Sequence, residues 1–519
     1  MIFESPLPDV EIPEVSLPTY VLARASELGD KVAIIDGPTG RTLTYSQLAD
    51  AIARLAGGLA ARGFGPGDVL AVMAPNVPEY AVLFHGAAMA GGTVTTVNPT
   101  YTANEVHHQL TDSGASLLVT IPMFLEVATA GAEGTGVTDT FVLGEATDGA
   151  ASVADLFGEP LDAAVEVDPV RDVVALPYSS GTTGLSKGVM LTHHNLVANI
   201  AQVLGASGMD ESDVVIAVLP FFHIYGMQVL MNAGLRAGAT IVTMPRFDLE
   251  QFLQLHQQHG VTRSFVAPPI VVALAKHPIV DQYDLSGVKQ VFSGAAPLSA
   301  ELAQEAAGRL GCEVIQGYGM TEMSPVSHLT VEGGFKPGSV GVTAPNTQTR
   351  IVDPLTGADL DVDEDGEVWV RGPQVMLGYL NNQKATAETL DDDGWLHTGD
   401  IGHVDADGHL FVVDRLKELI KFKGFQVPPA ELEALLLTHP AVADAAVIGL
   451  PDEESGEIPV GYVVLRPGVE ADPSDIQSFV AGQVAHYKQV RVLNVVDEIP
   501  KSASGKILRR ILRDQAAED

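Results

Sequence analysis

Cysteine is almost absent from this 519-residue sequence, and positively charged residues are scarce. The single cysteine, Cys312, excludes a disulfide framework and indicates a protein of the reducing cytoplasm. Only 29 lysines and arginines accompany 66 aspartates and glutamates, and the formal net charge is −37. Such an acidic chain is unsuited to nucleic acid or anionic membrane as a general partner. The same scarcity makes every local cluster of basic residues informative.

Apolar runs long enough to span a membrane are also missing. Two uncharged stretches, Tyr80–Asn104 and Val214–Leu235, come nearest, but glycine, proline, threonine, histidine and asparagine interrupt them. A spanning helix requires about 20 predominantly apolar residues. We therefore predict that both stretches are buried core and that the second lines a pocket. The first residues lack the basic and apolar regions of a secretory signal, and the last three are no organelle address.

Composition and length predict a globular protein of more than one domain. Hydrophobic residues make up 46% of the chain and charged residues 18%, and the length exceeds that of an ordinary single core. Thr44 and Gln47 form a capping box ahead of apolar residues spaced by three and four, which predicts a helix. Helices and strands then alternate up to residue 119, which predicts doubly wound α/β layers with a parallel sheet. They are the strands Val69–Met73, Thr93–Val97 and Leu117–Val119 and the helices Glu79–Met89 and Ala103–Asp112.

A second, smaller unit is predicted at the C-terminal end. Short alternating runs after residue 353, Glu367–Arg371 and His409–Val413, predict antiparallel strands and a small β-barrel-like part of the N-terminal domain. From Arg415 onward an α+β unit follows, so we predict domains at residues 1–414 and 415–519. Its elements are predicted as the helices Pro429–Leu437 and Pro473–His486, the strands Ala443–Gly449, Val460–Leu465 and Arg491–Val496, and a basic tail.

The stretch Ser179–Gly188 has the composition of a phosphate-binding loop. It follows the apolar run Val173–Leu176, which predicts a buried strand, and the weakly patterned Val137–Asp168, which predicts a surface connection. Glycines let backbone N–H groups converge on an anion, serine and threonine hydroxyls add donors, and Lys187 supplies charge. The order is not that of a Walker A loop. An ordinary Ser/Gly turn is the alternative, but the lysine and the preceding strand favour a polyphosphate site.

Later segments carry further candidate residues. Gln316–Glu322 places glycines beside an aromatic ring and a carboxylate, which suits base stacking and Mg²⁺ binding, although a turn entering a helix would look alike. His397–Asp400 ends in a carboxylate that could hold ribose hydroxyls. Lys506 lies in a loop near the C-terminus, where a lone lysine is usually just exposed. Four cations are concentrated within Asp414–Gly424, namely Arg415, Lys417, Lys421 and Lys423.

In this order and along most of the chain, these segments resemble the adenylate-forming superfamily of acyl-CoA synthetases, luciferases and peptide-synthetase adenylation domains. The closest resemblance is to 4-coumarate–CoA ligases. The resemblance implies a two-step reaction: a carboxylate attacks the α-phosphorus of Mg·ATP to give an acyl-adenylate and pyrophosphate, and coenzyme A then displaces AMP. The matching segments are Ser179–Gly188, Pro220–Tyr225, Gly294–Pro297, Gln316–Glu322, His397–Asp400, Asp414–Val427 and Lys501–Lys506.

The resemblance also assigns residues to the first step. Lys506 would bridge the substrate carboxylate and the α-phosphate, Thr321 would meet the α-phosphate, and Glu322 would bind magnesium. Adenine would lie against Tyr318, and ribose between Asp400 and Arg415. The full set expected at ATP or AMP is Ser179, Ser180, Gly181, Thr182, Thr183, Gly184, Lys187, Gly294, Ala295, Ala296, Pro297, Gln316, Gly317, Tyr318, Gly319, Thr321, Asp400, Arg415, Lys417 and Lys506.

For the second step, the resemblance implies that the small C-terminal domain is mobile and rotates near Asp414–Lys417. Rotation would withdraw Lys506, bring Lys421 to the thioester site and place Lys423 and Gly424 at coenzyme A. His223 would lie near the coenzyme A tunnel, although a lone histidine in an apolar run is more often a core residue.

The expected acid pocket combines glycines with flat aromatic and aliphatic walls, which suits a planar ring of cinnamate size. We therefore expect 4-coumarate or a related hydroxycinnamate as substrate. A medium- or long-chain fatty acid is an alternative, as are a luciferase-like or carrier-protein adenylating enzyme and a nucleotide-binding regulator that has lost its chemistry. The pocket residues are expected to be Tyr225, Val229, Phe292, Ala295, Gly317, Gly319, Pro325, Val326 and Gln426.

The chain departs from the family pattern at two positions. Ser186 stands where relatives usually carry proline, which should make the phosphate loop less stiff, and Pro428 replaces a common alanine, which bears on domain rotation. The pairs His107-His108 and His193-His194 have no metal-ligand spacing. We expect a cytoplasmic monomer whose partners are the acid, ATP and coenzyme A.

Overall fold

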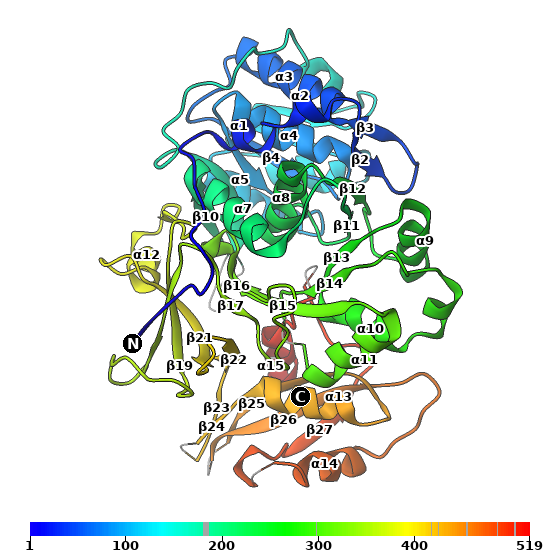
Figure 1. Ribbon diagram of the computed structural model, residues 1–519, viewed down its shortest axis with the longest axis vertical. Helices are drawn as coiled ribbons and strands as arrows, with labels where there is room; N and C mark the ends of the chain where they lie inside the picture. The colour runs from blue at the N-terminus through cyan, green and yellow to red at the C-terminus, as the bar shows by residue number, and fades with distance from the viewer. Residues whose placement is uncertain are drawn as a thin grey trace.

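The structure is a computed structural model that describes residues 1–179, 186–296, 298–416, 418–423, 425–452, 455–484, 486–502 and 505–518 (Figure 1). Most of the chain forms a large upper body, and the segment after residue 415 forms a smaller lobe at the lower end of Figure 1. This division follows the change of pattern seen in the sequence. The exact domain boundary, 414/415, stays a prediction.

The first large sheet has a parallel centre and an antiparallel edge. Its order is β20-β10-β9-β5-β4-β6-β7-β8, and β10 and β20 run antiparallel to their neighbours. Every residue of β4 is buried, as expected for a parallel strand covered on both faces. The strands are β4 (Val69–Met73), β5 (Thr93–Thr96), β6 (Leu117–Thr120), β7 (Asp139–Val142), β8 (Ala151–Ser152), β9 (Val173–Ser179), β10 (Lys187–Thr192) and β20 (Gly378–Tyr379).

The second large sheet lies on the other side of a helical layer and has the order β17-β16-β15-β14-β13-β11-β12-β2-β3. Its central strands are parallel, and β3, β16 and β17 are antiparallel at the two edges. The strands are β2 (Val32–Asp36), β3 (Thr42–Thr44), β11 (Val214–Ala217), β12 (Thr240–Thr243), β13 (Arg263–Val266), β14 (Gln290–Ser293), β15 (Glu313–Gly319), β16 (Val326–Leu329) and β17 (Val342–Thr343).

Helices fill the space between the two sheets and cover their outer faces. α4 contacts β4 and β5 of the first sheet and β2 of the second, and α7 contacts both β10 and β16. The two faces of β4 belong to different apolar clusters, because Leu70 and Val72 pack inward while Val69, Ala71 and Met73 pack under α5 and α6.

The inner helices are α1 (Leu17–Val21), α2 (Ala25–Leu28), α3 (Tyr45–Ala61), α4 (Pro78–Met89), α7 (His193–Ser207), the π-helix η3 (Tyr225–Asn232) and α8 (Ala233–Ala237). The outer helices are α5 (Ala103–Ser113) and α6 (Leu125–Ala132) on the first sheet, and α9 (Leu249–His259), α10 (Pro268–Lys276) and α11 (Ala300–Leu310) on the second. Short 3₁₀ helices are η1 (Pro122–Phe124), η2 (Val153–Leu156), η4 (Pro278–Gln282), η5 (Thr321–Met323) and η6 (His486–Lys488).

An antiparallel sheet forms the small β part that the sequence predicts beside the two large sheets. Its order is β1-β18-β19-β21-β22, and β21 separates the two strands that were predicted from alternating patterns, β19 and β22. The chain therefore enters its last lobe from an edge strand. The elements are β1 (Ile2–Glu4), β18 (Gln348–Val352), β19 (Gly366–Arg371), β21 (Leu396–Val404), β22 (Leu410–Arg415) and the helix α12 (Gln383–Thr389).

The C-terminal lobe has apolar clusters of its own. One includes Phe422, Leu432, Val447 and Ile476, and a second on the other side of the same sheet includes Ile448 and Leu512. Its elements are β23 (Ile420–Phe422), β24 (Phe425–Val427), β25 (Val442–Asp452), β26 (Gly456–Leu465), β27 (Val492–Val495), α13 (Pro429–Thr438), α14 (Pro473–Ala481) and α15 (Arg509–Glu518).

Most predicted elements are confirmed, including the capping box of Thr44 and Gln47 at the start of α3. Three predictions are wrong in part. Val137–Asp168 holds β7, β8 and η2 in addition to surface chain, because short strands at a sheet edge need little apolar pattern. The helix predicted at Pro473–His486 ends at Ala481, before Gly482, and the basic tail forms the helix α15.

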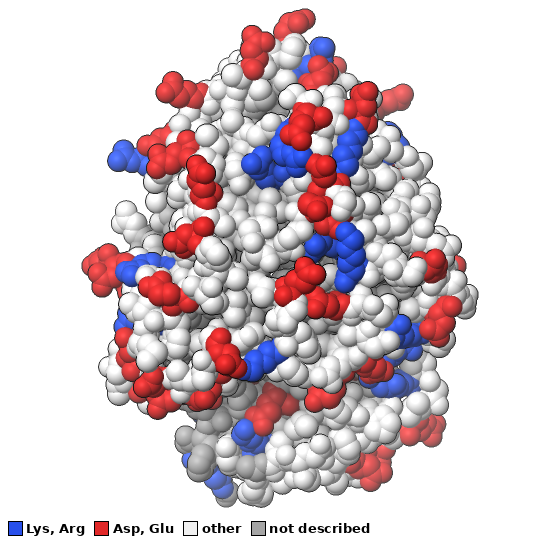
Figure 2. Space-filling model, in the orientation of Figure 1, with Lys and Arg blue, Asp and Glu red and all other residues white. Residues whose placement is uncertain are grey.

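Both uncharged stretches are buried within the large body, the first in α4 and β5 and the second in β11, η3 and α8. Among the described residues, no helix combines the length and apolar character needed to cross a membrane. Acidic side chains are spread over the face shown in Figure 2, and basic ones occur singly or in small groups between them.

Candidate functional site

The end of β15 meets the antiparallel sheet through one aspartate. The hydroxyl of Tyr318 donates a hydrogen bond of 2.6 Å to Oδ2 of Asp400, and Nε of Arg415 lies 3.0 Å from Oδ1 of the same carboxylate. Asp400 and Arg415 face each other on β21 and β22, so the strand register sets this pairing. The structure thus brings together three residues that were predicted for adenine and ribose.

Burial and charge set the protonation of this group. Removal from water raises the pKa of the Tyr318 phenol well above its usual value, and the neighbouring Asp400 carboxylate raises it further. Burial disfavours the Arg415 guanidinium, but Asp400 and Glu418 outweigh that effect and raise the pKa of Arg415. Tyr318 therefore stays a neutral donor, and Arg415 stays charged.

Glu322 lies in η5 with a side chain that is only 4% exposed. Its Oε1 accepts hydrogen bonds from Ser179 Oγ at 3.0 Å and from the hydroxyl of Tyr379 at 2.8 Å. These contacts join the end of β9, η5 and β20, which are far apart in sequence. The predicted metal ligand is thus held at the root of the predicted phosphate loop, and Thr321 lies half-buried beside it.

Tyr379 also contacts Lys187, the lysine predicted to bind phosphate. The Lys187 ammonium lies over the Tyr379 ring, 4.7 Å from its centroid. At the same end of the loop, the backbone oxygen of Ser186 lies 3.2 Å from Nε2 of His108. Tyr379 was missed in the sequence because Gly378-Tyr379 forms a two-residue strand with no periodic pattern. A glycine–aromatic pair was the only available signal.

Lys506 reaches this site from the C-terminal lobe. Its backbone and that of Ser502 close a tight turn, and Gly505 in this turn has φ +84°, a conformation that favours glycine. A side chain on Gly505 would stand 3.1 Å from Cβ of Ala267, just before α10, so the turn packs directly against the large body. Removal from water and, to a smaller extent, the nearby Arg415 cation lower the pKa of Lys506 to about 8.

His223 faces the same region. Burial lowers the pKa of its imidazole to about 4, and the Lys506 charge contributes to the shift. The backbone N–H of Tyr225 donates to Nδ1 of His223 at 3.3 Å, which fits a neutral ring with its proton on Nε2. The structure therefore places the predicted histidine within electrostatic reach of the predicted catalytic lysine.

Aromatic rings pack on glycines among the residues predicted for the acid pocket. The Tyr225 ring packs against Gly294, where an added Cβ would lie 2.8 Å from Cε1, and the Tyr225 hydroxyl donates to the backbone oxygen of Phe292 at 3.4 Å. The Phe292 ring covers Gly317, where an added Cβ would lie 2.5 Å from Cζ. Phe292 is backed by Phe265 with ring centroids 5.6 Å apart. Any larger residue at these glycines would displace an aromatic wall.

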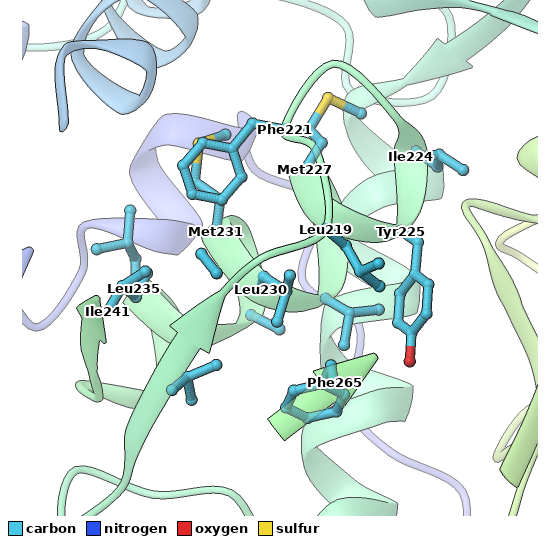
Figure 3. Close-up of a cluster of buried hydrophobic side chains, with 14 of the residues drawn as sticks. Leu219, Phe221, Ile224, Tyr225, Met227, Leu230, Met231, Leu235, Ile241 and Phe265 are labelled. Atoms are coloured by element: carbon cyan, nitrogen blue, oxygen red, sulfur yellow. The ribbon is translucent and has the colours of Figure 1, made fainter. Parts of the chain in front are cut away.

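The η3 segment forms the apolar backing of this wall. Figure 3 shows its cluster of buried side chains, with Phe221, Met227 and Leu230 inside it and Tyr225 at its edge. Val229 of η3 is 2% exposed and Val326 of β16 is 9% exposed. This confirms that the stretch Val214–Leu235 is buried core.

The neighbouring loop after β14 is held by Gln316. Its Oε1 accepts the backbone N–H of Leu298 at 3.1 Å, while its buried Nε2 has no partner among the described residues. Ala295 has φ +72°, which a residue other than glycine rarely adopts. Ala295 is exposed and Ala296 half-buried. On the facing side, Gly319 lies against the backbone oxygen of Pro325, where an added Cβ would come within 2.1 Å.

Lys421 and Lys423 are not part of this assembly. Lys421 is exposed on β23, and its backbone N–H donates to Glu457 at 2.7 Å. Figure 1 shows β23 and β24 at the lower end of the molecule, apart from β14 and β15. Lys423 is also exposed, with φ +49°. Several predicted residues lie outside the described part of the chain: Ser180, Gly181, Thr182, Thr183, Gly184, Pro297, Lys417, Gly424 and the side chain of Gln426.

The residues around Glu322 suit a divalent cation with oxygen ligands. Both described hydrogen bonds to this carboxylate use Oε1, and Oε2 accepts none from the residues that the structure describes. Carboxylate and hydroxyl oxygens match the ligand preference of Mg²⁺, which takes few protein ligands and completes its shell with phosphates and water. Within the described ranges, no group of three or more histidine, cysteine, aspartate or glutamate side chains is placed to hold a metal ion, so Glu322 would need phosphate and water as further ligands.

A layered α/β body with a small C-terminal lobe, whose Lys506 lies within electrostatic reach of Asp400 and Arg415, is the arrangement expected of adenylate-forming proteins. The chain matches the AMP-binding enzyme family over residues 21–380 and the C-terminal domain of AMP-binding enzymes over residues 431–506. It belongs to the AMP-binding enzyme family.

Relatives and solved structures agree with this assignment. The chain is 46% identical to 4-coumarate–CoA ligase 3 of Oryza sativa subsp. japonica, over 100% of this chain and 95% of that protein. The anthranilate CoA ligase AuaEII, solved with anthranoyl-AMP, superposes with a TM-score of 0.91 at 27% identity, covering 97% of this chain and 98% of that one. ATP-bound MatB from Rhodopseudomonas palustris has a TM-score of 0.88 at 30% identity, covering 96% and 99% of the two chains.

Proposed function

We propose that the chain is an ATP-dependent carboxylic acid–CoA ligase that forms an acyl-adenylate and then a coenzyme A thioester. The observation that carries this proposal is the docking of Lys506. This half-buried lysine from the small lobe lies within electrostatic reach of Arg415, Asp400 and His223. Such a lysine needs an anionic partner, and an α-phosphate together with a substrate carboxylate would supply it.

In the first step the chain mainly positions reactants and neutralises charge. Asp400 has acceptor capacity beyond its bonds to Tyr318 and Arg415, so it can accept from ribose hydroxyls. Ser179 and Lys187 would hold the outer phosphates. Lys506 would donate to the carboxylate and the α-phosphate as the carboxylate oxygen forms its bond to phosphorus and pyrophosphate leaves.

Glu322 would hold magnesium, which when bound supplies charge neutralisation for the phosphates. Ser179 donates to the carboxylate oxygen Oε1, which orients Glu322 without consuming Oε2. The buried setting of Glu322 strengthens the attraction between its charge and a cation.

The second step requires another arrangement of the lobes. Coenzyme A would attack the acyl carbonyl and AMP would leave, with Lys421, Lys423 and Gly424 moved to the thioester site. The exposure of Lys421 on β23 supports this proposal, because in the described arrangement that lysine has no catalytic role to fill. The neutral imidazole of His223 would lie at the wall that the thiol approaches.

The substrate we propose is 4-coumarate or a related hydroxycinnamate. The flat Tyr225 and Phe292 rings, which pack on Gly294 and Gly317, would suit a planar aromatic acid as pocket walls, and the relative from Oryza sativa is named a 4-coumarate–CoA ligase. A medium-chain fatty acid is the second candidate, because Val229 and Val326 make the wall apolar. We further propose a cytoplasmic monomer, in keeping with the free thiol of Cys312.

The test is a panel of acids assayed for release of pyrophosphate and AMP with Mg·ATP, in the presence and absence of coenzyme A. We expect acid-dependent pyrophosphate release, coenzyme A-dependent turnover, and 4-coumarate ahead of octanoate. A higher kcat/KM for octanoate would select the fatty-acid alternative. Sustained turnover without coenzyme A would indicate another adenylating activity, and no pyrophosphate with any acid would overturn the proposal.

A further inference from the structure

Tyr379 contacts two residues of the predicted nucleotide site that are far apart in the sequence, Glu322 and Lys187. Its hydroxyl donates to Oε1 of Glu322 at 2.8 Å, and its ring face lies beneath the ammonium of Lys187, 4.7 Å from the centroid. Ser179, at the other end of the phosphate loop, donates to the same carboxylate oxygen. Tyr379 therefore links Lys187 to the carboxylate of Glu322, and that carboxylate also binds Ser179.

The backbone fixes Tyr379 in this position. Val189 of β10 pairs with Tyr379 of β20, so the tyrosine belongs to the same strand pair that carries Lys187. Its N–H donates to Oγ1 of Thr386 at 2.9 Å. Gly378 has φ +148°, and an added Cβ there would stand 2.8 Å from the Thr386 methyl group, so only glycine fits before the tyrosine.

The phenol is a stable donor toward Glu322. Tyr379 is 6% exposed, and its hydroxyl donates to Oε1 of Glu322 at 2.8 Å inside this buried setting. The hydroxyl therefore directs its proton at Oε1 and leaves Oε2 to face a cation. The negative face of the ring attracts the Lys187 ammonium and keeps it close to the carboxylate.

We propose that Tyr379 is a positioning residue that sets the orientation of Glu322 for the metal and the resting place of Lys187 for the phosphates. The proposal rests on the proposed function, since it takes Glu322 as the metal ligand. Hydroxyl and ring have separable roles. The hydroxyl acts on metal affinity, and the ring acts on affinity for the metal-free nucleotide.

Two substitutions separate these roles. Tyr379→Phe removes the hydroxyl and keeps the ring, and Tyr379→Leu removes both. The direct readout is Mn²⁺ binding, followed by the electron paramagnetic resonance signal of free Mn²⁺, in the presence of α,β-methylene-ATP, which cannot be cleaved at the reacting bond. We expect about tenfold weaker Mn²⁺ binding in Tyr379→Phe, the size typical of a lost partner of a metal ligand.

Calorimetry of the same analogue in EDTA reports on the ring. Tyr379→Phe should bind the metal-free analogue as the wild type does, and Tyr379→Leu should bind it about threefold more weakly, as expected for a lost cation–π contact. Tyr45→Phe is the matched control. It removes an equally buried hydroxyl, which donates to Ala239 at 2.7 Å far from the site, and it should change neither affinity.

Unchanged Mn²⁺ affinity in Tyr379→Phe would overturn the proposal, as would equal losses in Tyr379→Phe and Tyr45→Phe. Melting temperature and circular dichroism establish that each variant is folded, and a Tyr379→Phe variant that fails to fold overturns a purely positional role. Because the readout is metal binding, it decides on Tyr379 even where no acid releases pyrophosphate. In contrast, acid-dependent pyrophosphate release by the wild type together with unchanged Mn²⁺ affinity in Tyr379→Phe would overturn the role of Tyr379 and leave the proposed function standing.

Discussion

The two sides of the candidate site are built differently. On the large body, Glu322 and Asp400 are each held by two side chains, and all of these come from strands or from a helix against the main apolar core. On the small lobe, Lys506 follows Gly505, which packs against Ala267 and Pro269 of the large body. Glu322 and Asp400 are therefore preorganised by the sheets of the large body, whereas the position of Lys506 depends on how the small lobe packs.

This difference explains how one fold can serve two reaction steps. In the proposed mechanism, the groups that bind the nucleotide are needed in both steps, and Glu322 and Asp400 are held by hydrogen bonds and an ion pair. The proposed role of Lys506 ends when pyrophosphate leaves, and this lysine lies on a lobe with separate apolar clusters. The turn can therefore leave without unfolding the nucleotide site.

The first prediction concerns the buried ion pairs of the C-terminal lobe that lie close to Lys506 in the sequence. Arg509, three residues later, donates to Glu418 and to both carboxylate oxygens of Glu433 at 2.8 and 2.9 Å, and all three side chains are nearly buried. Arg509→Met would leave two buried carboxylates unpaired, which costs about 3–5 kcal/mol. We expect destabilisation of the C-terminal lobe and loss of pyrophosphate release, with ATP binding to the large body retained.

The matched control is Arg510→Met, since Arg510 is exposed beside it. Differential scanning calorimetry and limited proteolysis should show early opening of the lobe only in Arg509→Met. Equal melting behaviour in the two variants would mean that the buried ion pairs do not hold the lobe together.

The second prediction uses the ionisation of Lys506. Its pKa in the docked lobe is lowered to about 8, so the ammonium is present below pH 8 and is lost as pH rises above it. We expect kcat/KM for ATP to be level below pH 8 and to fall about tenfold per pH unit above it, because this parameter reports on the free enzyme. Lys506→Arg keeps its charge, so its kcat/KM for ATP should not fall above pH 8. An identical fall in that variant would assign the ionisation to another group.

Sequence reasoning located the secondary-structure elements that depend on local pattern. The capping box at Thr44, the alternating elements and the stretch Ser179–Gly188 need only neighbours in the chain, and the structure forms the helix and the strands around them. The family resemblance added Lys506, which as a lone lysine has no local signal at all. Its position beside Arg415 and His223 is visible only in the folded chain.

Long-range partners could not be predicted in the same way. Tyr379 meets Lys187 because β20 joins the edge of β10, and Arg509 meets Glu418 and Glu433 because α15 packs back on the lobe. The sequence shows neither pairing, since a two-residue strand and a charged tail carry no apolar period. The packing of the Phe292 ring on Gly317 is also outside local pattern, because β14 and β15 bring these residues together.

The smallest expected effect concerns the predicted acid pocket, where the Phe292 ring covers Gly317. Phe292 is 9% exposed, and Phe292→Ala would open space beside Gly317. We expect the ratio of kcat/KM for a ring-substituted, bulkier cinnamate to that for 4-coumarate to rise about tenfold. Phe157→Ala, the same change at an exposed and remote position, should leave the ratio alone. An unchanged ranking of acids in Phe292→Ala would remove this ring from the pocket.

We propose that the nucleotide site is fixed and that Lys506 moves with the C-terminal lobe. The most direct test is to assay the two half-reactions separately in Lys506→Ala and Lys421→Ala. The first assay follows pyrophosphate released from Mg·ATP and 4-coumarate, and the second follows thioester formed from preformed coumaroyl-adenylate and coenzyme A. We predict that Lys506→Ala loses the first reaction by about a hundredfold or more and keeps the second, and that Lys421→Ala does the reverse. Equal loss of both reactions in Lys506→Ala would contradict the account, because that lysine would then belong to the fixed side.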